Sequence, residues 1–325
     1  MQIDFLFKVA HDILKRTQSV LIVAHKKPDG DTVGATAAIR SWCQQKGLAV
    51  TNFCNDPLPS QYFFLRGTEK YTNDVRVFDN QYDVLITADC GDLHFAGIHE
   101  HVAKMTAPNE KRRPLLINID HHITNSMYGD LNIVDAHASS TCELLHRFFT
   151  KTGVELDQNM ATCLLTGIIT DTGHFSNPAT THEALETASS LLRQGAKSHE
   201  ISRRLLRNKS IDSLRLWGSV LSRLKYNEKL GVASTVIFNR DLENKISEEH
   251  IEGVSNFLNQ FLDAKVIMVL RETPDGKVRG SLRSSENVDV SQIAKLMGGG
   301  GHKKAAGFAV PGRIVEDATG WRLEE

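Results

Sequence analysis

Three apolar segments that lead into acidic residues constrain the fold of this chain most strongly. These segments cover residues 20–24, 83–89 and 115–120. Near-continuous apolar runs of this length are typical of strands buried on both faces, so they predict a mostly parallel sheet flanked by helices. Residues 3–16 and 32–46 carry the apolar spacing of such helices. Two further short strands are expected at 50–54 and 75–78.

Histidine and aspartate side chains gather where these segments end. The candidates from the strand ends and from one apolar helix, expected over 160–170, are His25, Asp29, Asp31, Asp89, Asp120, His121, His122 and Asp171. Because the carboxyl ends of parallel strands meet at one edge of a sheet, we expect these side chains to share one site. Imidazole nitrogen and carboxylate oxygen are ligands of divalent cations such as manganese or zinc. The alternative is a group of helix caps and solvated side chains, but a core seldom holds this many unpaired acids.

The number of candidate ligands suits two divalent cations that each have three or four protein ligands. Two cations about 3.5–4 Å apart can share a carboxylate and a water molecule, and they stabilise both ends of an in-line displacement at phosphorus. Since metal-bound water ionises near neutral pH, no serine or cysteine nucleophile is required. The mixed nitrogen and oxygen donors favour manganese over magnesium. Asp120 can instead lie behind the ligands and fix the tautomer of a ligand histidine.

The second half of the chain shows the pattern of a smaller, separate α/β unit. Its expected elements are strands at 232–238, 265–270 and 277–282, a hairpin turn at 273–276, and helices at 247–261 and 290–297. A glycine run, Gly298–Gly301, precedes His302 and is expected to form a loop. Glycine lets backbone N–H groups approach an anion, and Arg279 and Arg283 can bind phosphate bidentately. We therefore expect a substrate clamp that faces the metal site, rather than a flexible surface turn.

Composition limits the environment and the partners of the chain. Its 325 residues favour two domains, and its net charge of −1 gives no global field that would attract long duplex nucleic acid. The five cysteines are scattered without a C-x-x-C pair, which argues against a disulfide framework and favours the cytoplasm. The sequence shows neither a signal peptide pattern nor an apolar run long enough for a membrane span.

Taken together, the motifs resemble those of the DHH phosphoesterases. His25-x-x-Pro28-Asp29-Gly30-Asp31, Asp89, Asp120-His121-His122 and Asp171 look like the four motifs of that family, and Gly299-Gly300-Gly301-His302 with Ala305-Ala306-Gly307 looks like the DHHA1 signature. The layout without extra modules is similar to the small nanoRNase and pAp-phosphatase branch. The resemblance implies a DHH domain over 1–190, a helical linker over 191–215 and a mixed-sheet DHHA1 domain over 216–325, with the active site in the cleft between the domains.

The resemblance also implies roles for individual residues. His25, Asp29 and Asp89 would hold one manganese ion. Asp31, His121 and Asp171 would hold the other, with Asp89 as the bridging ligand. His122 would contact the scissile phosphate and assist the leaving group, and Asp120 would support the adjacent histidines. The groups implied for substrate binding are Arg279, Arg283, His302, the glycines Gly299, Gly300 and Gly301, and Asn125.

We therefore expect a two-metal phosphoesterase in which metal-bound hydroxide attacks phosphorus, with Mg2+ or Co2+ able to replace Mn2+. Its expected substrates are very short single-stranded oligoribonucleotides, from which it would release 5′-mononucleotides, and 3′-phosphoadenosine 5′-phosphate (pAp), which it would convert to AMP. A homodimer is compatible with this expectation. The alternatives are a phosphodiesterase for cyclic di-AMP or pApA and, disfavoured by the few lysines and arginines at the glycine run, a manganese pyrophosphatase or exopolyphosphatase. A nucleotide sensor with an inactive site would lack a ligand, and none is missing.

Overall fold

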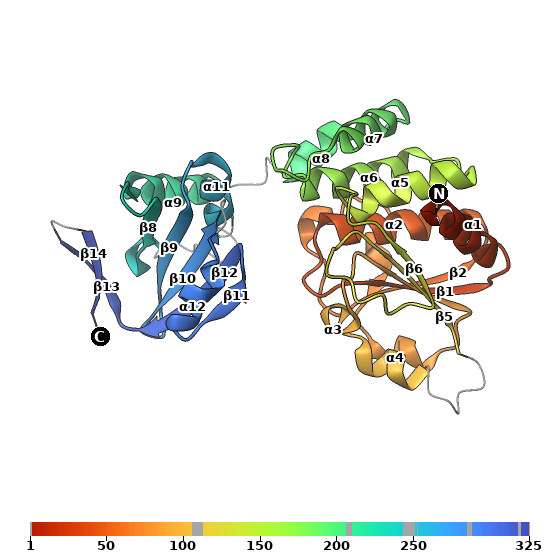
Figure 1. Ribbon diagram of the computed structural model, residues 1–325, viewed down its shortest axis with the longest axis horizontal. Helices are drawn as coiled ribbons and strands as arrows, with labels where there is room; N and C mark the ends of the chain where they lie inside the picture. The colour runs from red at the N-terminus through yellow and green to blue at the C-terminus, as the bar shows by residue number, and fades with distance from the viewer. Residues whose placement is uncertain are drawn as a thin grey trace. The chain divides into compact units, whose positions relative to one another are not determined.

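The chain divides into two compact units, Met1–Asn208 and Lys209–Glu325, in the computed structural model. Figure 1 labels the elements of both units. The structure describes residues 2–105, 113–205, 210–242, 251, 253–284, 288–317 and 320–324. None of the helices in these ranges has both the length and the apolar character needed to cross a membrane.

The N-terminal unit is built on a six-stranded sheet with the order β3-β2-β1-β4-β5-β6. Its strands are β1 (Ser19–Ala24), β2 (Ala49–Cys54), β3 (Tyr71–Thr72), β4 (Val84–Ala88), β5 (Leu115–Asp120) and β6 (Leu131–Val134). Every neighbouring pair is parallel, which confirms the predicted sheet type. The strand order reverses between β1 and β4, and in sheets of this kind ligands bind beyond the carboxyl ends of the strands at that reversal.

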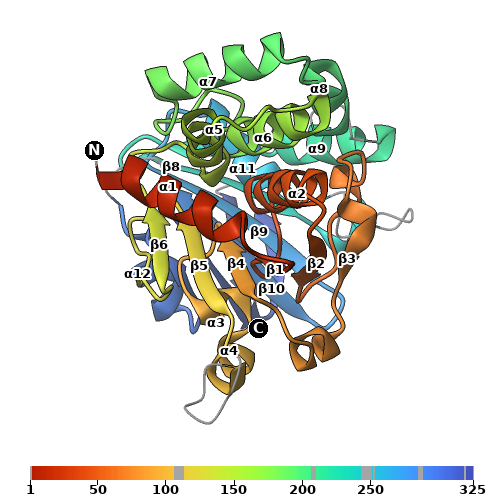
Figure 2. The same ribbon diagram turned by 90° about the vertical axis from the view of Figure 1, so that its right-hand side faces the viewer.

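Helices cover both faces of this sheet, as Figures 1 and 2 show. The described helices of this unit are α1 (Gln2–Leu14), α2 (Gly30–Gln45), α3 (Leu93–Ala96), α4 (His99–Met105), α5 (Thr141–Thr152), α6 (Gln158–Asp171), α7 (His182–Arg193) and α8 (Ser198–Leu205), of which α7 and α8 pack on the outside of α5 and α6 rather than on the sheet. Alternate residues of β1 supply the two cores: Val20 and Ile22 pack under α1, α2, α5 and α6, whereas Leu21 and Val23 pack under α3 and α4. Burial on both faces explains why the strand sequence is almost continuously apolar.

Some short segments of this unit, the strand β3 among them, differ from the sequence prediction. Val75–Phe78 is not a strand, because residues Val75–Asp79 form a 3-10 helix whose N-cap, Asp74, accepts a hydrogen bond from the backbone N–H of Arg76. Of this helix only Phe78 is buried, so its apolar residues do not form a strand with two covered faces. The edge strand β6 was not predicted, since Ile133 is its one buried residue.

The C-terminal unit contains a mixed six-stranded sheet with the order β11-β12-β10-β9-β8-β7. Its strands are β7 (Lys225–Asn227), β8 (Val232–Ile237), β9 (Val266–Thr273), β10 (Lys277–Ser284), β11 (Gly300–His302) and β12 (Ala305–Pro311). Among the described strands of this C-terminal sheet, β8 and β9 form the only parallel pair, and the other neighbouring pairs are antiparallel. The described helices are α9 (Ile211–Ser222), α11 (Val254–Phe261) and α12 (Val290–Leu296), and β13 (Arg313–Asp317) pairs with β14 (Gly320–Glu324).

Three predictions about this unit concern the hairpin, the glycine run and the first helix expected there. The hairpin at 273–276 is confirmed, with Thr273 paired to Lys277 and Gly276 in the left-handed region at φ 73°. The glycine run is not wholly a loop, because Gly300 and Gly301 belong to β11 and pair with Gly307 and Ala306. Part of the expected helix at 247–261 is present as α11, and its expected cap, Ser247, lies outside the described residues.

Candidate metal centre

The turn after β1 places two candidate ligands beside each other. Asp29 is the N-cap of α2, and its Oδ1 accepts hydrogen bonds from the backbone N–H groups of Asp31 (3.0 Å) and Thr32 (3.1 Å). Asp29 Oδ1 also lies 3.7 Å from Nε2 of His25. Asp29 therefore does cap a helix, which was the alternative to metal binding. The cap also places its carboxylate within reach of a cation that His25 would bind.

The orientation of the His25 ring is fixed by contacts on the side away from the acidic residues. Its Nδ1 donates to the carbonyl oxygen of Lys26 over 2.6 Å, so Nε2 faces the acidic residues. The ring of Phe95 stacks on the imidazole at 4.7 Å between centroids. A histidine with one nitrogen engaged by a carbonyl and the other directed at carboxylates has the arrangement that metal-ligating histidines usually have.

Asp89 connects two groups of candidate ligands. Its Oδ2 lies 3.4 Å from Nε2 of His25, and its Oδ1 lies 3.6 Å from Nε2 of His121 and 3.6 Å from Nδ1 of His122. The side chain is buried, and the backbone adopts the left-handed conformation at φ 63°. This conformation costs most residues other than glycine roughly 1–2 kcal/mol and costs aspartate and asparagine less, and backbone of this kind is common at functional sites.

The second group consists of Asp31, His121 and Asp171. Nε2 of His121 lies 3.1 Å from Oδ2 of Asp171 and 3.9 Å from Oδ2 of Asp31. The other ring nitrogen of His121 donates to the carbonyl oxygen of Ala138 over 3.2 Å. Asp171 is the last residue of α6, the apolar helix that was predicted to carry it.

Asp31, in the first turn of α2, is fully buried against the start of α5. Its Oδ2 accepts from the backbone N–H of Thr141 (2.6 Å) and its Oδ1 accepts from that of Cys142 (2.9 Å). The close approach of α2 and α6 requires Gly167, because a Cβ there would lie 2.5 Å from Oδ1 of Asp31. This contact was not predicted from the sequence. Helix N-termini attract anions in general, but that tendency does not indicate which carboxylate lies at the start of α5.

The protonation equilibria of the site reflect a surplus of negative charge. Burial raises the pKa of Asp31 well above its ordinary value, and the charges of Asp89 and Asp171 add to this. Burial and the nearby Asp89 likewise raise the pKa of Asp171 to about 6. Burial alone would lower the pKa of His25 and His121, but their contacts with the acids raise both to about 10. A cluster that retains protons so strongly would be stabilised by bound cations.

The residues present fit a pair of cations. Their ligand atoms form three groups within 4.8 Å: His25, Asp29 and Asp89; Asp31, His121 and Asp171; and Asp89, His121 and His122. Nε2 of His121 is buried and, within the described part of the chain, has no hydrogen-bond partner despite the surrounding carboxylates. A buried polar atom without a hydrogen bond is costly unless another partner, such as a metal ion, takes that place.

Asp120 lies behind these groups rather than within them. Its Oδ1 accepts from the backbone N–H of His121 and from Nδ1 of His122, both at 2.8 Å. Asn125, which the resemblance placed at the substrate, donates its side-chain amide to Asp120 Oδ2 over 2.5 Å. Although burial raises the pKa of Asp120, the bonds from His122 and Asn125 outweigh it and lower the value. The bond to Asp120 raises the pKa of His122, which favours its protonated form.

A basic cavity of about 510 Å³ lies on one face of the C-terminal sheet. Arg279 and Arg283 on β10 line it together with Arg271 on β9, and sequence analysis had not singled out Arg271. Nε of Arg283 donates to Oδ1 of Asn256 over 2.9 Å, and burial lowers the pKa of its guanidinium. Within the described residues this guanidinium pairs with an amide and a carbonyl rather than with a carboxylate, so it keeps its charge available for an anion.

The glycine run packs against β12. A Cβ at Gly299 would lie 2.1 Å from the carbonyl oxygen of Gly307, and Gly301 has φ 141°. Ala305 pairs with Arg283 on one side and with His302 on the other, so these three residues form one row across the sheet. The side chain of His302 lies outside the described part of the structure.

Two family models match the chain, one in the N-terminal unit and one in the C-terminal unit. The DHH family N-terminal domain matches residues 19–168, and the DHHA1 domain matches residues 229–319. The chain belongs to the DHH/DHHA1 family. The DHH match includes every candidate metal ligand except Asp171, which lies three residues beyond its end, and the DHHA1 match includes the basic cavity on β9 and β10.

Similar proteins extend over most of this DHH/DHHA1 chain. A bifunctional oligoribonuclease and PAP phosphatase NrnA of Thermus thermophilus is 29% identical over 96% of the chain and 90% of that protein. A probable bifunctional oligoribonuclease and PAP phosphatase NrnA of Streptococcus mutans is 27% identical over 93% of the chain and 92% of that protein. The crystal structure of an exopolyphosphatase-related protein from Bacteroides fragilis superposes with a TM-score of 0.82 at 24% identity over 93% of the chain and 90% of that protein, which shows a shared fold.

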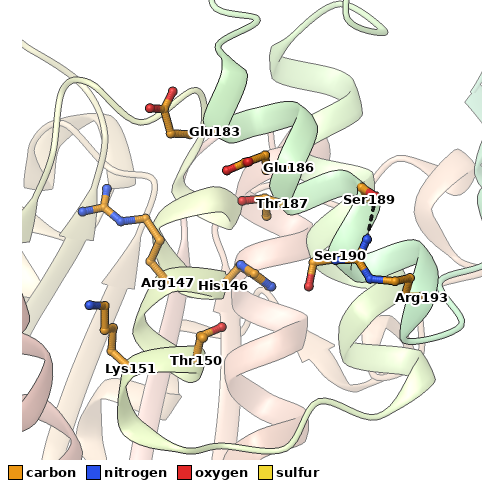
Figure 3. Close-up of a pocket in the computed structure, with 10 residues that line it drawn as sticks. All are labelled: His146, Arg147, Thr150, Lys151, Glu183, Glu186, Thr187, Ser189, Ser190 and Arg193. Carbon is orange, nitrogen blue, oxygen red and sulfur yellow. Dashed lines mark hydrogen bonds between the residues drawn. The ribbon is translucent and has the colours of Figure 1, made fainter.

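A cavity of about 560 Å³ between α5 and α7 of the DHH domain is separate from the metal centre. Figure 3 shows its lining, to which α5 contributes Arg147 and Lys151 and α7 contributes Glu183 and Glu186. Arg147 is paired with Asp135 over 2.6 Å. None of the candidate metal ligands lines this cavity, so its size does not identify it as the catalytic site.

Proposed function

We propose that this protein is a two-metal phosphoesterase that removes mononucleotides from very short oligoribonucleotides and converts pAp to AMP. The observation that carries the proposal is the position of Asp89, whose two carboxylate oxygens face His25 and His121 in separate ligand groups. A carboxylate placed in this way would be available to two cations, one held with His25 and the other with His121. The names of the relatives from Thermus thermophilus and Streptococcus mutans support the choice of substrates.

His25, Asp29 and Asp89 would hold one cation, and Asp31, Asp89, His121 and Asp171 would hold the other. Bound divalent cations supply an activated water molecule and neutralise the charge that develops on the phosphoryl group. We propose manganese because each group combines imidazole nitrogen with carboxylate oxygen. The five free, buried cysteines support a location in the reducing cytoplasm.

His122 would act on the leaving group. Its Nδ1 is bound to Asp120, so Nε2 is the ring nitrogen that can reach a substrate oxygen. The raised pKa keeps this ring protonated to higher pH, which suits a donor of the proton that the leaving oxygen needs. Asp120 would be a positioning residue that sets the ring orientation and the charge of His122.

The arginines of the DHHA1 domain would bind a phosphate that is not cleaved. Arg283 is positioned by Asn256 and presents the planar donor set that binds phosphate bidentately. A cavity with three arginines neutralises only a few charges, which matches a substrate that carries few phosphates.

The proposal can be tested with metal-depleted full-length protein. Ribonucleotides of two to five residues, pAp, pApA, cyclic di-AMP and pyrophosphate are incubated with Mn2+, Mg2+, Co2+ or chelator, and products are separated by chromatography. We expect release of 5′-mononucleotides and AMP with Mn2+, and no release with chelator. Hydrolysis of pyrophosphate alone, or of the cyclic dinucleotide alone, would refute the proposed substrate class.

A further inference from the structure

A cavity of about 430 Å³ opens beyond the carboxyl ends of β2 and β3 in the DHH domain. Its walls come from the segment after β2, which includes Asp56, and from the segment that includes Glu69 and Tyr71. β2 is the neighbour of β1, the strand that ends at His25. The cavity therefore lies on the same edge of the sheet as the metal centre, where ligands of such sheets bind.

Two contacts join the cavity wall to the turn that carries His25 and Asp29. The backbone N–H of Lys27 donates to Oδ2 of Asp56 over 2.8 Å, and Sγ of Cys54 donates to the carbonyl oxygen of His25 over 3.3 Å. Lys27 adopts the left-handed conformation at φ 51°, which places its N–H against Asp56. The cavity wall at Asp56 is thus connected by a single hydrogen bond to the backbone of Lys27, which lies between the candidate ligands His25 and Asp29.

The cavity presents an aromatic ring on a rigid support. Phe63 lines it and is 62% exposed, although large apolar side chains are usually covered. Its neighbours Tyr62 and Leu65 are 4% and 1% exposed, so the short helix η1 (Ser60–Tyr62) and the turn after it are anchored in the core. The ring of Phe63 is therefore held outward by its anchored neighbours. Such a ring is suited to stacking against a planar ligand.

The polar lining excludes a phosphate and suits a nucleoside. The lining contains two carboxylates, Asp56 and Glu69, and no lysine or arginine among its described residues. Carboxylates repel phosphate but accept hydrogen bonds from ribose hydroxyls. In nucleotide-binding sheets of this type an acid just after the second strand binds the ribose 2′-OH, and Asp56 lies two residues beyond β2.

We infer that this cavity binds the nucleoside next to the scissile phosphate of a short RNA, with the base on Phe63 and a ribose hydroxyl on Asp56. The inference deepens the proposed function and rests on it for the identity of the substrate. The metal centre would hold the phosphate, and the cavity one strand away would hold the nucleoside attached to it. Preference for RNA over DNA would then depend on Asp56.

Binding can be measured without turnover. A ribodinucleotide that contains 2-aminopurine is titrated with the full-length protein in chelator, and quenching of its fluorescence reports stacking. We expect Phe63→Ala to weaken binding about tenfold, since stacking on an aromatic ring is worth about 1–3 kcal/mol per base, and Phe63→Tyr to retain it. Phe5→Ala on α1 is the matched control, because Phe5 is 66% exposed and lies outside the cavity lining. Equal affinities for the Phe63→Ala and Phe5→Ala variants would overturn the inference.

Measurements of hydrolysis distinguish a failure of this inference from a failure of the proposed function. Wild-type protein and the Phe63→Ala variant are compared with Mn2+ on a ribodinucleotide and on its analogues that lack one base. Loss of one base should raise KM about tenfold in the wild type and have little effect in the variant. Asp56→Asn should reduce the preference for ribodinucleotides over deoxydinucleotides. If the wild type cleaves dinucleotides but Phe63→Ala responds to base removal as the wild type does, the inference fails and the proposed function stands. If the wild type cleaves none, the proposed function fails, and the fluorescence titration decides the inference.

Discussion

The hydroxyl of Thr141 donates a hydrogen bond of 3.1 Å to Oδ1 of Asp89. The backbone N–H of the same residue donates to Oδ2 of Asp31 over 2.6 Å. Thr141 therefore donates hydrogen bonds to two candidate ligands, Asp31 and Asp89, which belong to different ligand groups and are far apart in the sequence. Because it is the first residue of α5, the positive end of that helix also lies at the buried carboxylate of Asp31.

We predict that Thr141→Val weakens metal binding and lowers kcat by about 10–100-fold, as is typical when a partner of a metal ligand is lost. The substitution keeps the backbone donor to Asp31 and removes only the hydroxyl that orients Asp89. Thr141→Ser should restore both properties, and calorimetric Mn2+ titration measures the affinity. Thr152→Val is the control, since the Thr152 hydroxyl donates to the carbonyl of Phe148 at the other end of α5. Unchanged Mn2+ affinity in Thr141→Val would contradict the positioning role.

Substitution of Asp89 should abolish both cation sites together. Asp89 has φ 63°, and asparagine adopts this conformation at little cost, so Asp89→Asn tests the carboxylate without adding backbone strain. We expect a fold stability close to that of the wild type and a loss of activity beyond the 10–100-fold typical of groups outside the ligand set. Asp89→Gly, which also adopts this backbone conformation, should be equally inactive. Mn2+-dependent hydrolysis at the wild-type rate in Asp89→Asn would exclude a bridging role.

Part of the arrangement of the candidate ligands could be predicted from the sequence, because strand ends of one parallel sheet must share an edge. His25 and Asp89 were placed together by that rule, and the structure brings their side chains within 3.4 Å. The sequence alone could not predict that Thr141 and Cys142 donate hydrogen bonds to Asp31, because that contact depends on how α5 packs against α2. The left-handed backbone of Asp89 was also not predicted, although aspartate adopts this conformation more readily than most residues.

Short elements were predicted less well than long ones, for a physical reason. The apolar residues of Val75–Phe78 suggested a strand, but Asp74 caps a 3-10 helix there and that capping bond decides the local structure. The run at Gly300 and Gly301 suggested a loop, yet pairing with β12 makes it a strand. In both cases one nearby contact outweighs the weak conformational preference of a few residues.

The stability of the metal-free protein should fall as pH rises. The pKa of Asp171 is raised from 3.8 to about 6 and those of His25 and His121 from 6.5 to about 10, so the folded state binds more protons than the unfolded state in both ranges. Stability then decreases with pH between about 4 and 6 and again between about 6.5 and 10. Bound Mn2+ replaces these protons, so its stabilising effect should grow with pH.

Thermal unfolding in chelator and in Mn2+, recorded from pH 6.5 to 9.5, measures both trends. About 1 kcal/mol corresponds to roughly 2–4 °C in a unit of this size. The pH dependence should be smaller in Asp89→Asn, because the charge of Asp89 contributes to the raised pKa of both histidines. A melting temperature in chelator that rises with pH across this range would contradict the predicted sign.

Asp120→Asn should shift the pH profile of hydrolysis. The hydrogen bond from His122 to the Asp120 carboxylate raises the pKa of that histidine, and an amide in its place removes the negative charge. The alkaline limb of the kcat profile, where His122 loses its proton, should therefore move to lower pH, and kcat should fall about tenfold. His122→Asn should remove this limb altogether. A profile in Asp120→Asn that coincides with that of the wild type would exclude the proton donor assigned to His122.

Arg283→Ala in the DHHA1 domain should raise KM about tenfold and leave Mn2+ affinity unchanged, because a charged hydrogen bond to a phosphate is worth about 1.5–3 kcal/mol. Arg283→Lys should restore little, since lysine lacks the planar donor set that lets one nitrogen contact Asn256 while others reach the anion. Arg313→Ala is the matched control: it removes an exposed arginine of the same unit that pairs with Glu324. Steady-state kinetics on a ribodinucleotide with and without a 5′-phosphate measures the effect. If Arg283→Ala lowers kcat without raising KM, Arg283 does not act through substrate binding.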